Sequence, residues 1–302
     1  MRMTNDNQKQ KLSESTDTAI AYSTCYAQPL LISFSGGRTS AFMCKLLLEL
    51  PKYKDNEKLF LFANTGKENE ETLKFVNECD KRFGLNLCWL EADVNFDKGK
   101  GTNYKIVSFE TASTNGEPFQ DVIKKYGLPS KLYRHCTREL KQVPIHKYAK
   151  DVLGKDYLTA IGIRADEMHR VGSKPNYIYP LAEMGFSETI IRNWWDKQDF
   201  GLGIKDYEGN CDLCFLKSQR KKLTLISENP NIYDWWNEME KKYFSEYQQK
   251  FDGIRNKTIE ELVELAKLPF KKAIDKHEIY KSQQSLFEPE MDVEYACFCS
   301  NT

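Results

Sequence analysis

Short apolar runs alternate with amphipathic stretches along the first third of the chain. The run at residues 30–34 ends at two glycines and predicts a buried parallel strand, and similar runs at 59–63 and 85–90 predict two more. Between these runs, residues 40–50 and 69–82 carry apolar side chains at helical spacing. Strand, helix, strand, helix and strand in this order predict an α/β fold built on a doubly wound parallel sheet.

The later part of the chain has a different pattern. Residues 157–163 predict a further strand, but after about residue 186 the pattern is that of polar and aromatic helices. These helices are expected over 188–198, 233–251 and 258–268. We therefore predict a helical C-terminal part that packs on the sheet.

Charge and composition narrow the class of function. The chain has 44 Lys and Arg residues and 44 Asp and Glu residues, which excludes a uniformly basic protein that coats DNA but allows a local basic patch. No run of about 18 apolar residues predicts a membrane span, and the N-terminus lacks the basic start and apolar centre of a secretory signal. We expect a cytoplasmic protein whose nine cysteines are reduced.

A glycine-containing loop follows the first predicted strand. Residues 35–40 read Ser-Gly-Gly-Arg-Thr-Ser and lead into a predicted helix. Two glycines allow a positive φ and let backbone N–H groups approach an anion, while the start of the helix adds partial positive charge. The alternative is an ordinary strand-to-helix turn, since the loop lacks the Gly-Lys ending of a Walker motif and the third glycine of the Rossmann fingerprint.

Polar motifs also follow two other predicted strands. Residues 64–68 read Asn-Thr-Gly-Lys-Glu, and residues 162–164 read Gly-Ile-Arg. Because ligands of such sheets bind beyond the carboxyl ends of the strands, both motifs should lie near the glycine-containing loop. An arginine at this position suits bidentate contact with a phosphate, and the alternative is a surface ion pair of Arg164 with Asp166 or Glu167.

Four motifs in order resemble a known family. The loop Ser-Gly-Gly-x-x-Ser is similar to the PP-loop of the ATP pyrophosphatase superfamily, the adenine nucleotide alpha hydrolases. Together with residues 64–68, the segment Cys-Thr-Arg-Glu-Leu-Lys at 136–141 and the segment Gly-Ile-Arg-Ala-Asp-Glu at 162–167, it resembles the phosphoadenylylsulfate (PAPS) reductase family. The resemblance covers roughly residues 30–225, and the combination of motifs is what makes it specific.

The resemblance implies a fold, a ligand and a set of site residues. The family has about five strands in a parallel sheet and binds ATP or a related adenylyl nucleotide, which we expect together with Mg²⁺. The residues expected to bind the nucleotide are Ser35, Gly36, Gly37, Thr39, Ser40, Asn64, Thr65, Gly66, Glu68, Gly162 and Arg164. The candidate catalytic residues are Ser35, Arg38, Lys141 and Arg164, of which Lys141 could instead lie on a solvated helix face.

Three parts of the chain follow from these motifs. Residues 1–28 are expected to form a flexible N-terminal tail. Residues 29–225 are expected to form the PP-loop nucleotide-binding domain and to include a Cys-x-x-Cys pair. Residues 226–302 are expected to form a helical region followed by a tail that carries cysteines.

The cysteines indicate a second centre. Cys211 and Cys214 form the Cys-x-x-Cys pair, which can face one metal ion. With Cys136 and either Cys299, which we prefer, or Cys297, they would supply four ligands for a [4Fe-4S] cluster or for a zinc ion. The occurrence of clusters among related members of the superfamily favours the cluster. A third interpretation is that these cysteines carry no metal and that the pair is redox-active. The remaining cysteines are expected in the core or the tail: Cys25, Cys44, Cys79 and Cys88.

Three functions are compatible with these motifs. The first is an ATP pyrophosphatase that adenylylates an acceptor, which sulfur then attacks; the partner would be a nucleic acid, a small molecule or a sulfur-donor protein. The second is a PAPS or adenylylsulfate reductase, although the chain ends in Cys-Phe-Cys-Ser-Asn-Thr where those enzymes have a Glu-Cys-Gly-Leu-His-type segment. The third is a non-catalytic nucleotide-binding subunit. A basic run either approaches a nucleic-acid backbone or forms a solvated face: Lys217, Arg220, Lys221 and Lys222.

Overall fold

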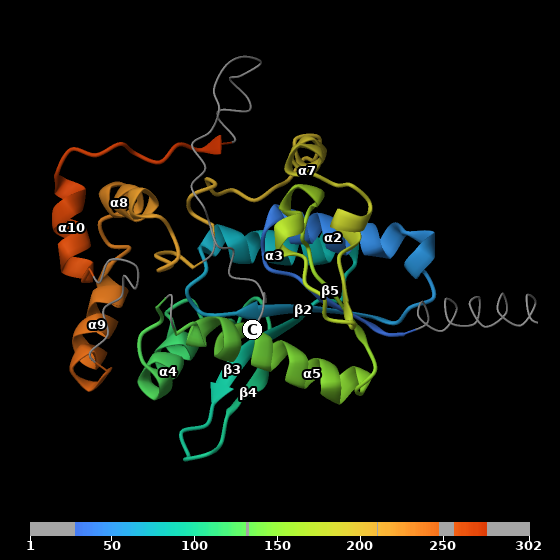
Figure 1. Cartoon of the computed structure of the whole chain (residues 1–302), viewed down its shortest axis with the longest axis horizontal. Coiled ribbons are helices and arrows are strands. Elements are labelled where there is room, and N and C mark those ends of the chain that lie inside the picture. The colour runs from blue at the N-terminus through green and yellow to red at the C-terminus, as the bar shows by residue number, and fades with distance from the viewer. Residues whose placement is uncertain (1–27, 131–132, 210, 248–256, 277–302) are drawn as a thin grey trace, which may run out of the picture.

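The computed structural model describes residues 28–130, 133–209, 211–247 and 257–276. It contains a six-stranded sheet in the order β4-β3-β2-β1-β5-β6 (Figure 1). All neighbouring strands pair in parallel except β3 and β4, which are antiparallel at one edge. The strands are β1 (Leu30–Ser33), β2 (Lys58–Asn64), β3 (Cys88–Val94), β4 (Thr102–Val107), β5 (Leu158–Ala160) and β6 (Tyr177–Ile178). The predicted α/β fold is confirmed, with two edge strands, β4 and β6, that the pattern did not reveal.

Helices cover both faces of the sheet (Figure 1). Alternation along β1 explains why both faces are apolar: Leu30 and Ile32 join the core under α2, whereas Leu31 joins the core that includes Ile145 of α5. One face carries α2 (Arg38–Glu49), α3 (Glu70–Phe83) and α7 (Glu188–Trp195), and the other carries α4 (Glu117–Tyr126) and α5 (Val143–Leu153). The short helices are η1 (Pro51–Tyr53), η2 (Cys136–Gln142), η3 (Ala165–Arg170) and α6 (Pro180–Glu183).

Local signals fix the ends of α3. The Asn69 side chain accepts a hydrogen bond from the Glu71 N–H at 3.0 Å and so caps the first turn. Gly84 ends the helix in the left-handed conformation, with a φ of +66°. This is the helix expected over 69–82, shifted by one residue at each end.

The C-terminal helices form their own apolar cluster with α4 and η2. They are α8 (Gln219–Glu228), α9 (Asp234–Tyr247) and α10 (Ile259–Lys267). The expected helical C-terminal part is thereby confirmed. The expectation of a solvated or nucleic-acid-facing basic run is wrong, because Lys217, Lys221 and Lys222 are only 2%, 7% and 1% exposed. They lie beside the Cys-x-x-Cys segment, inside the protein.

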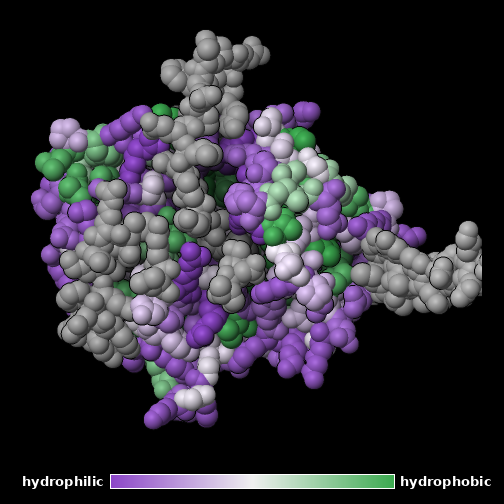
Figure 2. All heavy atoms as spheres, in the orientation of Figure 1, coloured by the Kyte–Doolittle hydropathy of each residue, from purple (hydrophilic) through white to green (hydrophobic). Residues whose placement is uncertain are grey.

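The described surface is mainly polar on the face shown in Figure 2, where hydrophobic residues occur in small separate areas. Two of the cysteines expected in the core, Cys44 and Cys79, are fully buried, and Cys88 is half-buried. Among the described helices, none combines the length and the apolar character that a bilayer-spanning segment needs.

Candidate nucleotide and cysteine sites

The predicted phosphate motifs meet where the strand order reverses. In the sheet, β1 lies between β2 and β5, so the chain leaves β1 toward one side and returns on the other. The carboxyl ends of strands at such a switch point form the usual ligand crevice of open α/β sheets. The loop at 35–37 follows β1, and Gly162 follows β5. A Cβ atom on Gly162 would lie 3.5 Å from the Ser40 Cα, so the two motifs are in contact.

The glycine-containing loop at residues 35–40 has a conformation that requires glycine at one position. Gly36 has a φ of +81°, and a Cβ atom there would lie 2.7 Å from the Thr72 Cγ2. The buried Ser40 hydroxyl holds the loop closed: it accepts from the Ser35 N–H at 3.1 Å, contacts the Ser35 Oγ at 2.7 Å and donates to the Gly37 carbonyl at 3.0 Å. Ser40 therefore shapes the loop from inside.

The start of α2 is open to an anion. Gly37 is the N-cap residue, no side chain caps the helix there, and the first turn holds no acidic residue. The first N–H groups of a helix have no partner within the helix, and the helix dipole makes this end electropositive. Ser35, Gly37 and Thr39 are each half-buried, which leaves this side of the loop accessible. These features together suit a phosphate.

Arg164 faces this helix start. Its Nη1 lies 3.4 Å from the Thr39 Oγ1, and its other nitrogens contact Asp166 at 3.1 Å and Glu188 at 3.3 Å. Burial alone would lower the pKa of Arg164, but the surrounding carboxylates raise it above its usual value, so the guanidinium remains charged. The ion pairs considered for Arg164 are present, and its guanidinium also contacts the loop at Thr39, whereas contact with a phosphate stays a prediction.

The Arg38 side chain has a different position from the one expected of a phosphate ligand. Its Nη2 donates to the Leu202 carbonyl at 2.6 Å, and its Nη1 lies 3.9 Å from an Asp206 carboxylate oxygen. Its own carbonyl accepts from the Trp195 Nε1 at 2.9 Å. Arg38 therefore joins α2 to residues 195–206, while the guanidinium beside Thr39 is that of Arg164.

Two further acidic side chains that hold Arg164 and Arg38 were not predicted from the sequence, namely Glu188 and Asp206. Arg192 of α7 pairs with Glu188 at 2.7 Å and with Asp206 at 2.8 Å. Glu188 in turn contacts Arg164, and Asp206 contacts Arg38. The i,i+4 spacing of Glu188 and Arg192 is a local signal, but nothing in the sequence links either residue to Asp206.

The end of β2 is built on buried hydrogen bonds. Asn64 is fully buried, and its amide donates to Glu91 at 2.7 Å and to the Ser113 carbonyl at 2.8 Å. Its Oδ1 accepts from the Gly66 N–H at 3.1 Å. Gly66 has a φ of +79° and lies against Ser113 and Gly116. Asn64 and Gly66 thus set the backbone of the 64–68 segment.

Thr65 and Glu68 of the same segment lie near a cysteine. Glu68 accepts from the Thr65 N–H at 2.8 Å and from the Thr65 hydroxyl at 2.7 Å. The Thr65 Oγ1 lies 3.5 Å from the Cys211 Sγ, and the Lys141 Nζ lies 3.7 Å from Glu68. Lys141 is largely buried, which excludes the solvated helix face considered for it.

Backbone contacts join this strand end to the Cys-x-x-Cys segment. Glu68 and Cys211 form an isolated antiparallel bridge. The Asp212 N–H donates to the Lys67 carbonyl at 2.8 Å, and the side chains of these two residues form an ion pair at 2.8 Å. The predicted nucleotide segment and the predicted metal segment are therefore paired directly.

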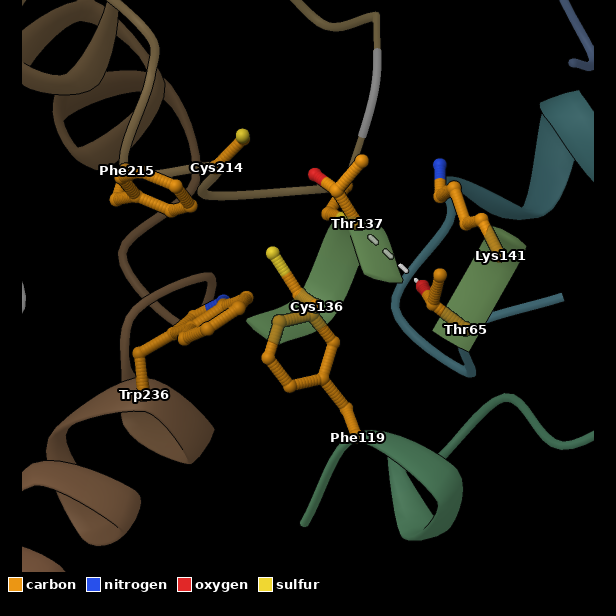
Figure 3. Close-up of a pocket in the computed structure, with 9 residues that line it drawn as sticks. Thr65, Phe119, Cys136, Thr137, Lys141, Cys214, Phe215 and Trp236 are labelled. Atoms are coloured by element: carbon orange, nitrogen blue, oxygen red, sulfur yellow. Dashed lines mark hydrogen bonds between the residues drawn. The ribbon is translucent and has the colours of Figure 1, made fainter. Parts of the chain in front are cut away.

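Three of the predicted metal ligands line one small cavity (Figure 3). Cys136, Cys211 and Cys214 are 8%, 7% and 4% exposed. Figure 3 shows Cys136 among aromatic rings, with Thr65 and Lys141 on the opposite side of the cavity. The aromatic lining consists of Phe119, Phe215 and Trp236. Three of the four proposed ligands therefore lie along one cavity, whereas Cys297 and Cys299 lie outside the described residues.

Burial sets the ionisation of these thiols. It raises the pKa of Cys211 to about 12, with the negative charge of Glu68 as a further cause, and it also raises the pKa of Cys136. Lys141 opposes both shifts. A raised pKa means less thiolate at a given pH, so both thiols are protonated at neutral pH when no metal is bound.

This leads to a first prediction, on thiol labelling. In metal-free folded protein, Cys211 should react with iodoacetamide at least about tenfold more slowly than in the unfolded chain near pH 8, because it carries less thiolate and is shielded. Its rate should still rise between pH 9 and about 12, the window of the shift. Peptide mass spectrometry at increasing pH measures this. Equal rates in folded and unfolded protein at pH 8 would contradict the raised pKa.

The cavity differs from the metal centres that the sequence suggests in size more than in the chemistry of its donors. Thiolates are the ligands that iron–sulfur clusters and structural zinc prefer. The cavity has a volume of about 10 Å³, room for about one water molecule. Within the described part of the chain, no three His, Cys, Asp or Glu residues are close enough to hold a metal ion. The donors suit a soft metal, but this arrangement does not fit a four-iron cluster unless the cavity widens.

A family model agrees with the first part of this geometry. Residues 29–111 match the phosphoadenosine phosphosulfate reductase domain. The matched range includes the phosphate loop after β1 and the 64–68 segment after β2, so it covers two of the four motifs. The other two motifs and the Cys-x-x-Cys pair lie beyond it.

Relatives of the chain share more of its length. An uncharacterized nin region protein of Escherichia phage lambda is 39% identical over 196 residues, which are 63% of this chain and 67% of the phage protein. Two uncharacterized proteins of Methanocaldococcus jannaschii are 29% and 30% identical, over 148 and 118 residues. The matched segments span only 25% and 22% of those two archaeal proteins. With its phosphate loop, its strand order and the matching domain, the chain belongs to the PAPS reductase-like family of the PP-loop ATP pyrophosphatase superfamily.

Proposed function

We propose that this protein binds ATP at the end of β1 and transfers its adenylyl group to an acceptor, which sulfur then attacks with release of AMP. One observation carries the proposal: the uncapped start of α2, preceded by Gly36 and Gly37, faces the Arg164 guanidinium at the switch point of the sheet. This arrangement offers backbone donors, a helix dipole and a fixed cation to a polyphosphate. Its family membership supports a nucleotide as the ligand.

Each group at the loop has a separate task in this proposal. The amides of Gly37 and of the first turn of α2 would hold the pyrophosphate as it leaves, because they are already oriented before the reaction. Arg164 would neutralise charge on the same group, and the hydroxyl of Thr39 would accompany it. Mg²⁺, when bound with the nucleotide, supplies further charge neutralisation. Ser40 and Arg38 would keep the loop in shape from behind.

The reaction makes a specific product. If the acceptor attacks the α-phosphorus, the purified full chain should release pyrophosphate and not orthophosphate from ATP, and it should exchange labelled pyrophosphate into ATP when the acceptor is supplied. Enzymatic detection of pyrophosphate with and without inorganic pyrophosphatase distinguishes the two products. If the chain binds ATP but turns it over with no class of acceptor, it is a nucleotide-binding subunit and not an enzyme.

A second prediction concerns the shape of the cation at the loop. Arg164→Lys keeps the charge but loses the planar fork, so we expect the affinity for ATP to fall about tenfold. Isothermal titration with ATP measures this. Arg82→Lys is the matched control, since Arg82 lies at the far end of α3 and pairs with Asp199 at the surface. Unchanged ATP affinity in Arg164→Lys would remove Arg164 from the binding site.

The reductase activity of the matching domain is the competing function. It needs a reactive thiolate that attacks the sulfonyl sulfur. Burial disfavours this for Cys136 and Cys211, whose thiols are protonated at neutral pH without metal. Release of sulfite from PAPS in the presence of a dithiol would favour the reductase, whereas pyrophosphate release from ATP favours adenylyl transfer.

We further propose that Cys136, Cys211 and Cys214, with Cys299 or Cys297, hold a [4Fe-4S] cluster, and zinc is the alternative. The three described cysteines share one cavity and supply soft donors, but the cavity must widen to admit a cluster. No step of the reaction is assigned to it. Anaerobic purification followed by iron, sulfide and zinc analysis tests this: about four irons and four sulfides per chain support the cluster, and one zinc replaces it.

A further inference from the structure

Three rings stack beside the cysteine cavity. His135, which precedes Cys136, lies 5.5 Å from Tyr126 and 6.0 Å from Tyr133 between ring centroids, with ring planes inclined by 25° and 10°. Tyr133 is 51% exposed. The rings therefore offer a flat, partly open stacking surface.

Cations surround these rings. The Arg138 guanidinium lies 5.8 Å from the Tyr126 ring centroid, and its side chain is 60% exposed. The Lys125 Nζ lies 5.3 Å from the same ring. The acidic group nearest to Arg138 is Glu139, which is buried and already ion-paired with it. The charge of Arg138 is therefore partly exposed to solvent, while that of Glu139 is turned inward.

The β3–β4 hairpin extends this surface. The Lys124 Nζ lies 4.6 Å from the exposed ring of Phe96, and Lys125 donates to the carbonyls of Asn95 and Lys100. The hairpin projects at the lower edge of Figure 1, and the same projection is mainly hydrophilic in Figure 2. We call these residues the ring–cation surface: Phe96, Lys124, Lys125, Tyr126, Tyr133, His135 and Arg138.

We infer that the ring–cation surface binds single-stranded nucleic acid, with an unpaired base stacked on Tyr133 and backbone phosphates beside Arg138 and the α4 lysines. Proteins bind unpaired strands through aromatic rings interspersed with cations. The rings stack on the π-faces of the bases, and the cations contact the phosphates of the backbone. A duplex hides the faces of its bases and would not use the rings. The net charge of the chain is zero, so the attraction must be local, as it is here.

The surface leads toward the cysteine cavity. His135 is followed directly by Cys136 and Thr137, which line the cavity together with Lys141. A strand held on the rings would therefore pass the mouth of this cavity. The inference deepens the proposed function, since it names a nucleic acid as the acceptor class. It rests on that function for the chemistry, but binding itself is independent of it.

Fluorescence anisotropy with the full chain tests the inference without ATP. The probes are labelled strands of about 20 nucleotides, as DNA, as RNA and as the DNA duplex. We expect both single strands, or one of them, to bind more tightly than the duplex, with an affinity that falls as salt rises from about 50 to 200 mM. The preference between DNA and RNA identifies the natural strand.

Variants of Tyr133 separate stacking from simple packing. Tyr133→Ala and Tyr133→Leu should both weaken binding about tenfold, whereas Tyr133→Trp should retain it. Leu268→Ala, at an exposed apolar residue just after α10, is the control and should bind like the unaltered chain. Thermal melting verifies that each variant is folded. Equal affinity of Tyr133→Ala and the unaltered chain, tighter binding of duplex, or no binding at low salt would overturn the inference.

The two proposals fail separately. If the chain binds single strands but not ATP, the proposed function is wrong and the inference on the ring–cation surface still holds. If substitution of Tyr133 does not change strand binding while the chain releases pyrophosphate from ATP, the inference on the ring–cation surface is wrong and the proposed function still holds.

Discussion

Gly36→Ala should lower the free energy of unfolding by about 2–5 kcal/mol and remove detectable ATP binding. Two costs add at this residue. Its φ of +81° is unfavourable for alanine by about 1–2 kcal/mol. The new Cβ would also lie 2.7 Å from the Thr72 Cγ2, and such overpacking costs about 1–3 kcal/mol. Urea denaturation measures the stability, and titration calorimetry measures the binding.

Other glycines of the chain separate the two costs. Gly84 has a φ of +66° but no atom within 4 Å of an added Cβ, so Gly84→Ala should lose only the backbone part. Gly37 has an ordinary φ of −99° and its nearest contact is at 3.9 Å, so Gly37→Ala should fold normally. Thr72→Ser removes the clashing methyl group and should restore part of the stability of Gly36→Ala. If Gly36→Ala were as stable as Gly84→Ala, the close contact would be wrong.

Lys217→Met should lower the free energy of unfolding by about 2–4 kcal/mol. The Lys217 side chain is 2% exposed, and its ammonium donates to the Gly209 carbonyl and, at 3.0 Å, to the Tyr207 carbonyl. Methionine fills a similar volume but leaves the buried Tyr207 carbonyl and the half-buried Gly209 carbonyl without this donor. An unsatisfied buried group costs about 1–3 kcal/mol, and the cost is lower where water reaches the carbonyl. Chemical denaturation measures the loss.

An exposed lysine of the same region is the control. Lys205 pairs with Glu228 at 3.1 Å while its side chain is 44% exposed, so Lys205→Met should change stability by less than about 1 kcal/mol. If Lys217→Met cost no more than this, the lysine would not support the Cys-x-x-Cys segment. Because the two carbonyls immediately precede this segment, Lys217→Met should also weaken metal binding if Cys211 and Cys214 are ligands.

The sheet could be predicted because its signals are local. Buried strands gave unbroken apolar runs, and Asn69 and Gly84 marked the ends of a helix. The third strand was expected at 85–90 but occupies Cys88–Val94, because Leu85 and Leu87 are buried in the turn before it and imitate a strand. The edge strand β4 escaped prediction, since most of its residues are partly or fully exposed and its pattern resembles that of a loop.

In the candidate site, too, the features with local signals could be predicted and those that depend on distant contacts could not. The loop glycines, Arg164 and the three cysteines could be identified from residue type and spacing. The position of Arg38 could not, because its partners Leu202 and Asp206 lie more than a hundred residues away along the chain. Lys217 resembled part of a solvated basic run, and only the fold shows that its charge serves backbone carbonyls. Burial of a charge depends on tertiary contacts that no local pattern contains.

The bridge between Glu68 and Cys211 has a consequence for how the two ends of the crevice behave together. A ligand that shifts the backbone at Glu68 also shifts the backbone at Cys211. The free energies of binding at the proposed nucleotide and metal sites are therefore coupled. By thermodynamic reciprocity, whatever factor a bound nucleotide imposes on the affinity for metal, the metal imposes on the nucleotide. In the proposed enzyme, the state of the cysteines would therefore alter the affinity for ATP.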